Sequence, residues 1–194
     1  MPDRLYSFVF RGLLTEEALD KAGRISKSTF TEFEAKKISE SLCINDLDEE
    51  IVIRAKKMSI VFTAISSFEN TVRNFVSKVL LESFGENWWI KSVQDNIRTK
   101  AESRKEEENK IRWHTNRGDS LINYTDFGDL VNIMKKNENW PLFEPHLVSI
   151  EWANQIIKSI ERSRNVIMHS GDLSNEDIER IGTYIRDWIK QIGA

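Results

Sequence analysis

Cysteine, proline and glycine are scarce in this chain of 194 residues, which contains 1 Cys, 3 Pro and 8 Gly. The single cysteine, Cys43, excludes a disulfide framework within the chain and indicates a reducing compartment. So few prolines and glycines provide too few turns for the many short strands of a sandwich or a barrel. The composition therefore favours helices.

Long apolar runs and a dominant charge are also absent. The longest strongly apolar run without a charged residue, residues 59–68, is about half as long as the roughly 20 residues that a membrane span requires. The N-terminus shows no basic-then-apolar leader, so we expect a cytoplasmic protein with no membrane partner. A formal net charge of −3 argues against non-specific nucleic-acid binding over the whole surface, so a polyanion would need a local basic site.

Apolar residues nevertheless make up 40% of the chain, with 6 Trp and 10 Phe among them, which is enough for one well-packed domain. The clearest periodicity, with steps of three and four over about six turns, comprises Met58, Val61, Ile65, Phe68, Val72, Phe75 and Val79. This spacing predicts one long helix with a buried face, which Gly85 ends. The Trp88–Trp89 pair that follows is predicted to pack in the core.

The first 50 residues give weaker signals, and we interpret residues 1–50 as an N-terminal extension that is helical in part. Residues 5–10 are typical of a short strand, and Thr15 is predicted to begin a helix that Gly23 ends. Thr29 and Glu32 have the spacing of a capping box, in which each side chain accepts a hydrogen bond from the other's backbone N–H. A second helix is therefore predicted to run to about Leu42.

Residues 51–194 are predicted to form a helical domain. Thr125 or Asp126 can cap a helix that Asn139, Trp140 and Pro141 end, with an apolar face of Phe127, Leu130, Val131 and Met134. A further helix is predicted from about Leu147 to His169, with Ile150, Ala153, Ile156, Ile157, Ile160 and Ile167 facing inward. Ser174, with Asp177 three residues later, begins the last helix. The sum is an all-α bundle of four or five main helices.

Residues 97–117 carry charges of both signs at helical spacing. This pattern is typical of an exposed helix face with weak ion pairs. The alternative is an arm that contacts a polynucleotide, because Trp113 and His114 place ring faces among cations such as Lys110 and Arg112.

Several kinds of chemistry are excluded by missing motifs. The chain has no Gly-rich phosphate loop, no nucleophilic-serine elbow and no dinucleotide fingerprint. Its histidines, His114, His146 and His169, lie far apart, and none has a second His or Cys at a metal-ligand spacing. We therefore expect no metal site and no cofactor.

One hexamer stands out at the end of the helix predicted from Leu147: Arg164-Asn165-Val166-Ile167-Met168-His169, shortly before Gly171. An Arg followed by a polar residue, with a His four to six positions after the Arg, resembles the signature of HEPN domains. These are all-α modules common among RNA-cleaving toxins and phage-defence proteins. Residues 68–73, the Trp88–Trp89 pair, residues 124–130, and Trp140 with Phe143 are similar to the Swt-type branch of this family. The resemblance extends over residues 55–190.

The resemblance implies a HEPN-like helical bundle, and a metal-independent endoribonuclease that acts as a homodimer and leaves a 2′,3′-cyclic phosphate and a 5′-hydroxyl. It implies that Arg164, Asn165 and His169 are catalytic, and that Glu69 and Arg73 support the site. It also implies a toxin or phage-defence setting, with RNA as the substrate and an antitoxin or companion protein as a further partner. The candidate RNA-binding residues are Lys110, Arg112, Trp113 and Arg162.

The residue types suit RNA cleavage without a metal. The reaction needs a base for the ribose 2′-OH, a cation for the charge on the phosphate, and an acid for the leaving 5′ oxygen. The guanidinium of Arg spans two phosphate oxygens, and His titrates near neutral pH. However, five residues of ideal helix place Arg164 and His169 about 140° apart and about 7.5 Å apart along the axis. A two-fold dimer that joins two helix ends in one cleft would correct this separation, as would a distorted helix end.

Each candidate also has a purely structural interpretation. His169 could be a cationic cap at a helix C-terminus, and Arg164 could pair with a carboxylate such as Glu69. Glu69 and Arg73 are four residues apart and predict a helix-surface ion pair. Asn165 could order a phosphate or His169, or bond the turn, and Arg162 also precedes His169 at an allowed spacing. The alternative functions are a non-catalytic HEPN dimer that binds RNA or a nucleotide, and a binding partner for a companion protein, which the negative net charge mildly favours.

Overall fold

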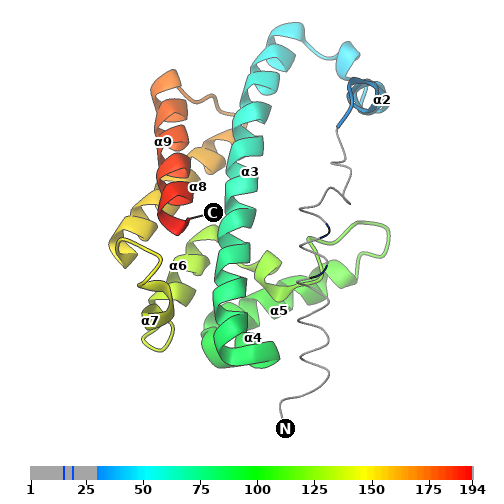
Figure 1. The fold of residues 1–194 in the computed structure, drawn as a ribbon. Coiled ribbons are helices and arrows are strands. Elements are labelled where there is room, and N and C mark those ends of the chain that lie inside the picture. Colours follow the sequence, from blue (N-terminus) through cyan, green and yellow to red (C-terminus); the bar gives the residue numbers. More distant parts are fainter. Residues whose placement is uncertain (1–14, 16–18, 20–29, 194) are drawn as a thin grey trace. The chain divides into compact units, whose positions relative to one another are not determined.

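The computed structural model of the chain describes Thr15, Leu19 and residues 30–193, and every regular element within these residues is a helix (Figure 1). The predicted all-α class is confirmed. The chain divides into two compact units, Met1–Val52 and Ile53–Ala194. The strand predicted at residues 5–10 and most of the helix predicted from Thr15 lie outside the described residues, although Thr15 and Leu19 are themselves helical.

The described part of the first unit contains α2 (Glu32–Ser41) and the 3₁₀ helix η1 (Ile44–Asp46). The capping box of α2 is formed by Thr31 and Glu34, not by Thr29 and Glu32 as predicted. The sequence TFTEFE offers the same Thr-x-x-Glu spacing twice, so local pattern alone does not decide between the two registers.

The long helix α3 (Glu49–Phe84) continues from the first unit through the second. Its buried apolar residues are Met58, Val61, Ile65, Phe68, Val72, Val76 and Leu80. The predicted stripe is correct up to Val72, but Phe75 and Val79 are only half-buried. A straight helix drifts by about 20° per heptad against a seven-residue repeat, so the buried face has moved on by one residue at its C-terminal end.

After α3 come η2 (Gly85–Asn87), α4 (Trp88–Ser92), α5 (Asp95–Asn109) and η3 (Leu121–Tyr124). The predicted burial of the tryptophan pair holds, because Trp89 is buried and Trp88 half-buried. The charged segment 97–117 is helical only as far as Asn109. Residues 110–120, including Trp113, therefore form a loop between α5 and η3.

The remaining helices are α6 (Phe127–Lys135), α7 (Trp140–Phe143), α8 (Ile150–Met168) and α9 (Asn175–Ile192). Asp126 caps α6 and Ser174 caps α9, as predicted. Trp140 and Pro141 do not end α6; they begin α7, where proline at the start of a helix loses no hydrogen bond. The helix predicted from Leu147 begins at Ile150, because Ser149 accepts a hydrogen bond from the Trp152 N–H and caps it.

Aromatic side chains from α3, α6, α8 and α9 meet in the core of the second unit. Phe68 contacts the rings of Phe127 and Trp188 edge-on, at centroid distances of 6.0 and 5.6 Å. The indole of Trp152 stacks on that of Trp188 at 5.5 Å. In Figure 1, α3 lies alongside the helices α6 to α9. Among the described helices, none combines the length and the apolar character that crossing a bilayer requires.

Candidate functional site

Arg164, Asn165 and His169 lie in the last turns of α8 and at its end. The buried residues of this helix are Ala153, Ile156, Ile157 and Ile160. Arg164 comes one turn after Ile160 on the same face, and its side chain is 37% exposed, so the guanidinium lies at the edge of the core. Asn165 and His169 are exposed.

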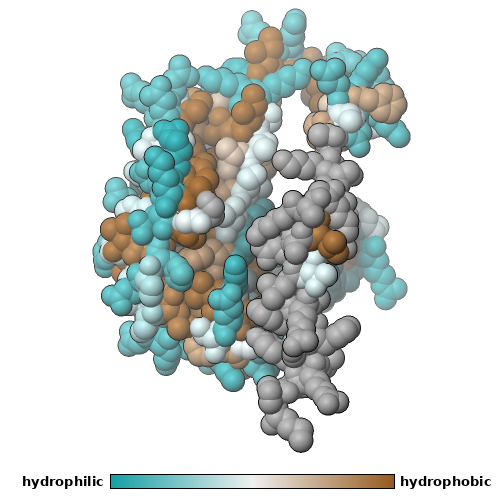
Figure 2. Space-filling model, viewed as in Figure 1, coloured by the Kyte–Doolittle hydropathy of each residue, from teal (hydrophilic) through white to brown (hydrophobic). Residues whose placement is uncertain are grey.

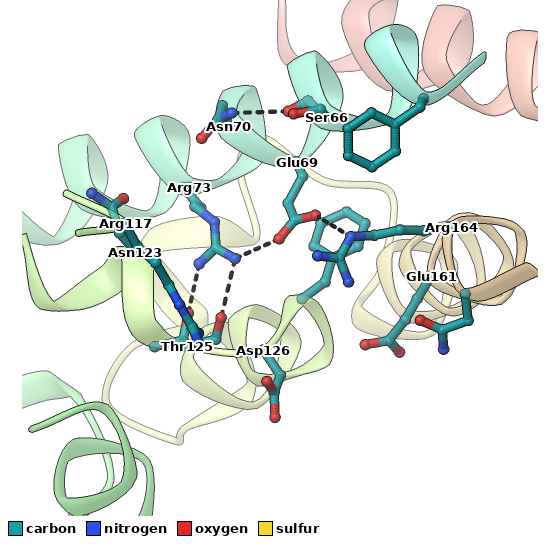
Figure 3. A pocket seen from close by; sticks show the side chains of 13 residues that line it. Ser66, Glu69, Asn70, Arg73, Arg117, Asn123, Thr125, Asp126, Glu161 and Arg164 are labelled. Atoms are coloured by element: carbon teal, nitrogen blue, oxygen red, sulfur yellow. Dashed lines mark hydrogen bonds and ion pairs between the residues drawn. The ribbon is translucent and has the colours of Figure 1, made fainter. Parts of the chain in front are cut away.

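Glu69 on α3 connects two arginines (Figure 3). Its Oε2 lies 3.3 Å from the Nε of Arg164, and its Oε1 accepts a hydrogen bond from Nη2 of Arg73. The structure thus contains the Arg164–Glu69 pair that the structural interpretation of Arg164 anticipates. It also contains the Glu69–Arg73 pair, but this pair is not on the helix surface, because Arg73 is buried and Glu69 is largely buried, with side chains 9% and 12% exposed.

Arg73 is held by the segment that precedes α6. Its Nη1 donates to the carbonyl oxygen of Ile122 and to Oγ1 of Thr125, and its Nη2 donates to the Thr125 carbonyl at 3.1 Å. A buried guanidinium with this many partners has little freedom to move. Arg73 therefore fixes Glu69, and Glu69 fixes the Nε of Arg164.

The two terminal nitrogens of Arg164 remain available. They make no hydrogen bond or ion pair with any of the residues that the structure describes. Figure 3 shows the guanidinium directed into the space between α3 and the segment that leads into α6. The arrangement leaves a planar, two-pronged cation facing a pocket, which is the geometry that binds two oxygens of a phosphate.

That pocket has a volume of about 720 Å³ and is lined by three parts of the second unit. From α3 come Phe62, Ser66, Glu69, Asn70 and Arg73; from residues 117–127 come Arg117, Asn123, Thr125, Asp126 and Phe127; from α8 come Glu161, Arg164 and Asn165. We call it the Arg164 pocket.

Two further carboxylates of the Arg164 pocket already have partners. Asp126 accepts a hydrogen bond from Nη1 of Arg104 at 2.8 Å and pairs with Lys100. Burial raises the pKa of the Asp126 carboxyl, but the hydrogen bonds from Arg104 and Lys100 outweigh it, so that its pKa lies below the ordinary value of 3.8. Glu161 accepts a hydrogen bond from the Gly128 N–H at the start of α6. These contacts reduce the repulsion that an incoming anion would meet.

His169 faces a different hollow. It lines a space of about 660 Å³ together with Lys158, Glu161, Arg162, Asn165 and Val166. Asn165 and Glu161 line both hollows, whereas Arg164 and His169 do not share one. The separation expected from ideal helix geometry is therefore present.

The end of α8 is regular as far as Met168. The N–H groups of Ser170 and Gly171 donate to the carbonyls of Ile167 and Val166, the two hydrogen bonds of a Schellman turn. Ser170 takes the left-handed conformation with φ 60°, although Gly171 is the residue predicted to end the helix. Gly171 lies one position later, where a Cβ would come within 2.8 Å of Cγ1 of Val166. No distortion of the helix brings His169 to Arg164.

The remaining predicted residues lie elsewhere. Arg162 is exposed beside His169, and Lys110, Arg112 and Trp113 belong to the exposed loop after α5. Arg117, Asn123 and Glu161 line the Arg164 pocket but are not predicted as site residues. The spacing of Glu161, three positions before Arg164, could have indicated a shared helix face. Among the described residues, no group of three or more His, Cys, Asp or Glu is placed to hold a metal ion.

An all-α bundle with an Arg-Asn segment and a His at the end of a core helix has the features of a HEPN domain. Comparison with protein families matches residues 63–193 to the Swt1-like HEPN family. Because the match covers more than half of the chain, the chain belongs to this family. Searches of curated proteins and of solved structures found no match to the chain.

Proposed function

We propose that the chain is a metal-independent endoribonuclease of HEPN type that acts as a homodimer. The observation that supports this most directly is the fork of Arg164, which Glu69 orients and whose terminal nitrogens face the pocket. Arginine in this geometry stabilises the additional negative charge that a phosphate acquires in the transition state.

In the proposed reaction the ribose 2′-oxygen attacks the adjacent phosphorus, and the bond from phosphorus to the 5′ oxygen breaks. The His169 of the partner subunit takes the proton of the 2′-OH, and solvent water protonates the leaving 5′ oxygen. Arg164 holds the non-bridging phosphate oxygens, and Asn165, which lines both hollows, orients the phosphate. The products are a 2′,3′-cyclic phosphate and a 5′-hydroxyl.

The dimer supplies what one chain lacks. Because Arg164 and His169 face different hollows, a second copy of the α8 end is needed to place a His opposite an Arg. Apolar surface is available for such an interface. Figure 2 shows it beside α3 and α9, and the exposed large apolar side chains of these helices in the second unit are Ile53, Ile60, Leu81 and Ile189.

The separation of Arg164 from His169 also supports the second candidate function, a HEPN dimer that binds RNA or a nucleotide without cleaving it. In either case the family suggests a toxin or phage-defence setting, with an antitoxin or companion protein as a partner. The two functions differ in whether the phosphodiester bond is broken.

The deciding experiment incubates the full chain with RNA in the presence of a metal chelator. We expect cleavage by the unaltered chain, and loss of cleavage in Arg164→Ala and His169→Ala. Arg186→Ala, which removes an exposed Arg on α9, serves as the matched control and should cleave normally. A single 2′-deoxy sugar at the cut site should block cleavage there. Cleavage at the deoxy position, or dependence on magnesium, would mean that water and a metal perform the reaction; binding without cleavage would favour the second function.

A further inference from the structure

The loop between α5 and η3 presents an aromatic ring to solvent among cations. Trp113 is 86% exposed, the highest value among the exposed large apolar side chains of the described residues. Residues 109–118 read NKIRWHTNRG and contain three cationic side chains and no carboxylate. In a chain with a net charge of −3, this is a local reversal of charge.

The loop is tied at both ends. Nδ2 of Asn116 donates to Oδ1 of Asn109 at 2.7 Å, and the Arg117 N–H donates to Oε2 of Glu108 at 3.1 Å. The Arg117 guanidinium also pairs with Glu108 and lies 5.8 Å from the centre of the Tyr124 ring. A loop with such a closed base loses less conformational entropy when a ligand binds to its tip.

At the tip of the loop, one aromatic and two cationic side chains are available to bind a ligand. Trp113 makes one described ring contact, an edge-on approach to His114 at 5.8 Å, which leaves the indole faces uncovered. The side chains of Lys110 and Arg112 make no hydrogen bond or ion pair with the described residues. An exposed indole beside two unpaired cations suits a polyanion with flat, apolar rings better than it suits an apolar protein surface.

Arg117 connects this loop to the Arg164 pocket. It anchors the base of the loop and also lines the pocket. Trp113 and Arg117 are four residues apart, so their Cα atoms are separated by at most about 14 Å. A nucleic-acid strand with a phosphate at Arg164 could therefore reach the indole within a few nucleotides.

We propose that Trp113 is a stacking site for a base of single-stranded RNA outside the cleavage position, and that Lys110 and Arg112 bind the phosphates beside that base. The proposal rests on the proposed function for the class of ligand. It requires an unstacked base, because the rings of a duplex are not accessible to the indole. Single-stranded segments are therefore the expected substrate class.

The test measures binding by fluorescence anisotropy, with the full chain carrying His169→Ala so that the RNA stays intact. The probe is a labelled single-stranded RNA of about 12 nucleotides, a length within the range that single-strand sites cover. Adding Trp113→Ala should weaken binding by about 5- to 150-fold, the loss that corresponds to one stacked base, whereas Trp113→Phe should retain most of the affinity. Ile90→Ala, which removes an exposed apolar side chain on α4, is the matched control and should bind as tightly as the parent.

The outcomes separate this inference from the proposed function. If the unaltered chain binds RNA but does not cleave it, and Trp113→Ala weakens binding, the stacking site stands and the ribonuclease proposal fails. If the unaltered chain cleaves RNA and Trp113→Ala binds as tightly as its parent, the stacking site alone is wrong. A change in oligomeric mass on Trp113→Ala with unchanged RNA affinity would assign the indole to a protein interface and overturn the inference. If Trp113→Ala weakened the binding of duplex RNA as much as that of single-stranded RNA, the preference for single strands would be contradicted.

Discussion

Glu69 binds two arginines whose surroundings differ. Arg73 is buried and holds the Ile122 and Thr125 carbonyls as well as Glu69, whereas Arg164 is partly exposed and uses a single nitrogen on Glu69. Burial of the charges makes removal of the first contact strongly destabilising, whereas solvent screening makes the second contact energetically weak. The chain thus separates a residue that supports the site from one that is free to act in it.

This difference predicts unequal effects on stability. Arg73→Met should lower the free energy of unfolding by about 3 kcal/mol, because it leaves buried acceptors without a donor and Glu69 with one cation. Arg164→Ala should change it by no more than about 1 kcal/mol, because the lost pair is partly exposed. Urea denaturation followed by far-UV circular dichroism measures both. Equal losses would make Arg164 a structural residue.

Asp126, which caps α6, predicts that the stability of the fold depends on pH. Its lowered pKa means that the folded chain favours the ionised carboxyl, so its stabilisation is fully present above the unfolded value of about 3.8 and is lost as the pH falls through the lowered pKa. Asp126→Asn keeps a good helix cap but removes the pairing with Arg104 and Lys100. At pH 7, urea denaturation should show that Asp126→Asn lowers the free energy of unfolding by at most about 1 kcal/mol.

The same comparison at acid pH is the control. The difference between the parent and Asp126→Asn should shrink as the pH falls from 3.8 through the lowered pKa of Asp126, since the parent carboxyl becomes neutral as well over this range. A difference that stays constant over this range would show that the ion pairs do not stabilise the fold.

At the scale of the element, the turn after α8 positions His169. Ser170 adopts a left-handed conformation that costs a non-glycine residue about 1 kcal/mol or more, and Gly171 packs where no Cβ fits. Ser170→Gly should therefore raise the free energy of unfolding by up to about 1 kcal/mol, whereas Gly171→Ala should lower it by about 1 kcal/mol or more. Thermal unfolding distinguishes the two substitutions, because the melting temperature should rise for Ser170→Gly and fall for Gly171→Ala. A destabilised Ser170→Gly chain would show that the serine side chain has a role of its own.

The helices were largely predictable because their signals are local. Apolar period and cap residues locate α6, α8, α9 and the C-terminal end of α3 to within a few residues, but the start of α3 at Glu49 lies nine residues before the first residue of the predicted stripe, Met58. The hexamer at the end of α8 is visible without a structure. The end of α5 was not predictable, since charged residues continue past Asn109 while the helix does not. The burial of Arg73 was also missed, because an i, i+4 Glu–Arg pair has the same pattern on a surface and in a core.

The candidate site was less predictable than the helices. Arg164, Asn165, Glu69 and Arg73 meet at one pocket, but Arg117 and Asn123 reach it from a loop and a 3₁₀ helix that no sequence spacing relates to α8. Tertiary packing alone brings them together. The location of His169 in a second hollow follows from helix geometry and was expected, whereas the hollow itself is visible only in the structure.

At the scale of the whole molecule, the proposed active site is divided between two copies. One chain offers an oriented Arg fork in one hollow and a His in another, with Asn165 and Glu161 between them. A two-fold axis beside the end of α8 would place each Arg164 near the partner's His169. The functional Arg–His pair would then come from different chains.

This arrangement predicts complementation between two inactive variants. A chain with Arg164→Ala and a chain with His169→Ala should each fail to cleave RNA, but after subunit exchange about half of the dimers contain one copy of each. Such a mixed dimer has one intact pair, the Arg164 of one chain and the His169 of the other, and no chain with both residues. We expect cleavage to appear on mixing, at a fraction of the parental rate, with a mass by light scattering of about two chains. A mixture that stays inactive although exchange is shown by mass spectrometry would mean that Arg164 and His169 must act within one chain. In that case the end of α8 would have to rearrange around the substrate, and a monomer would be sufficient for the chemistry.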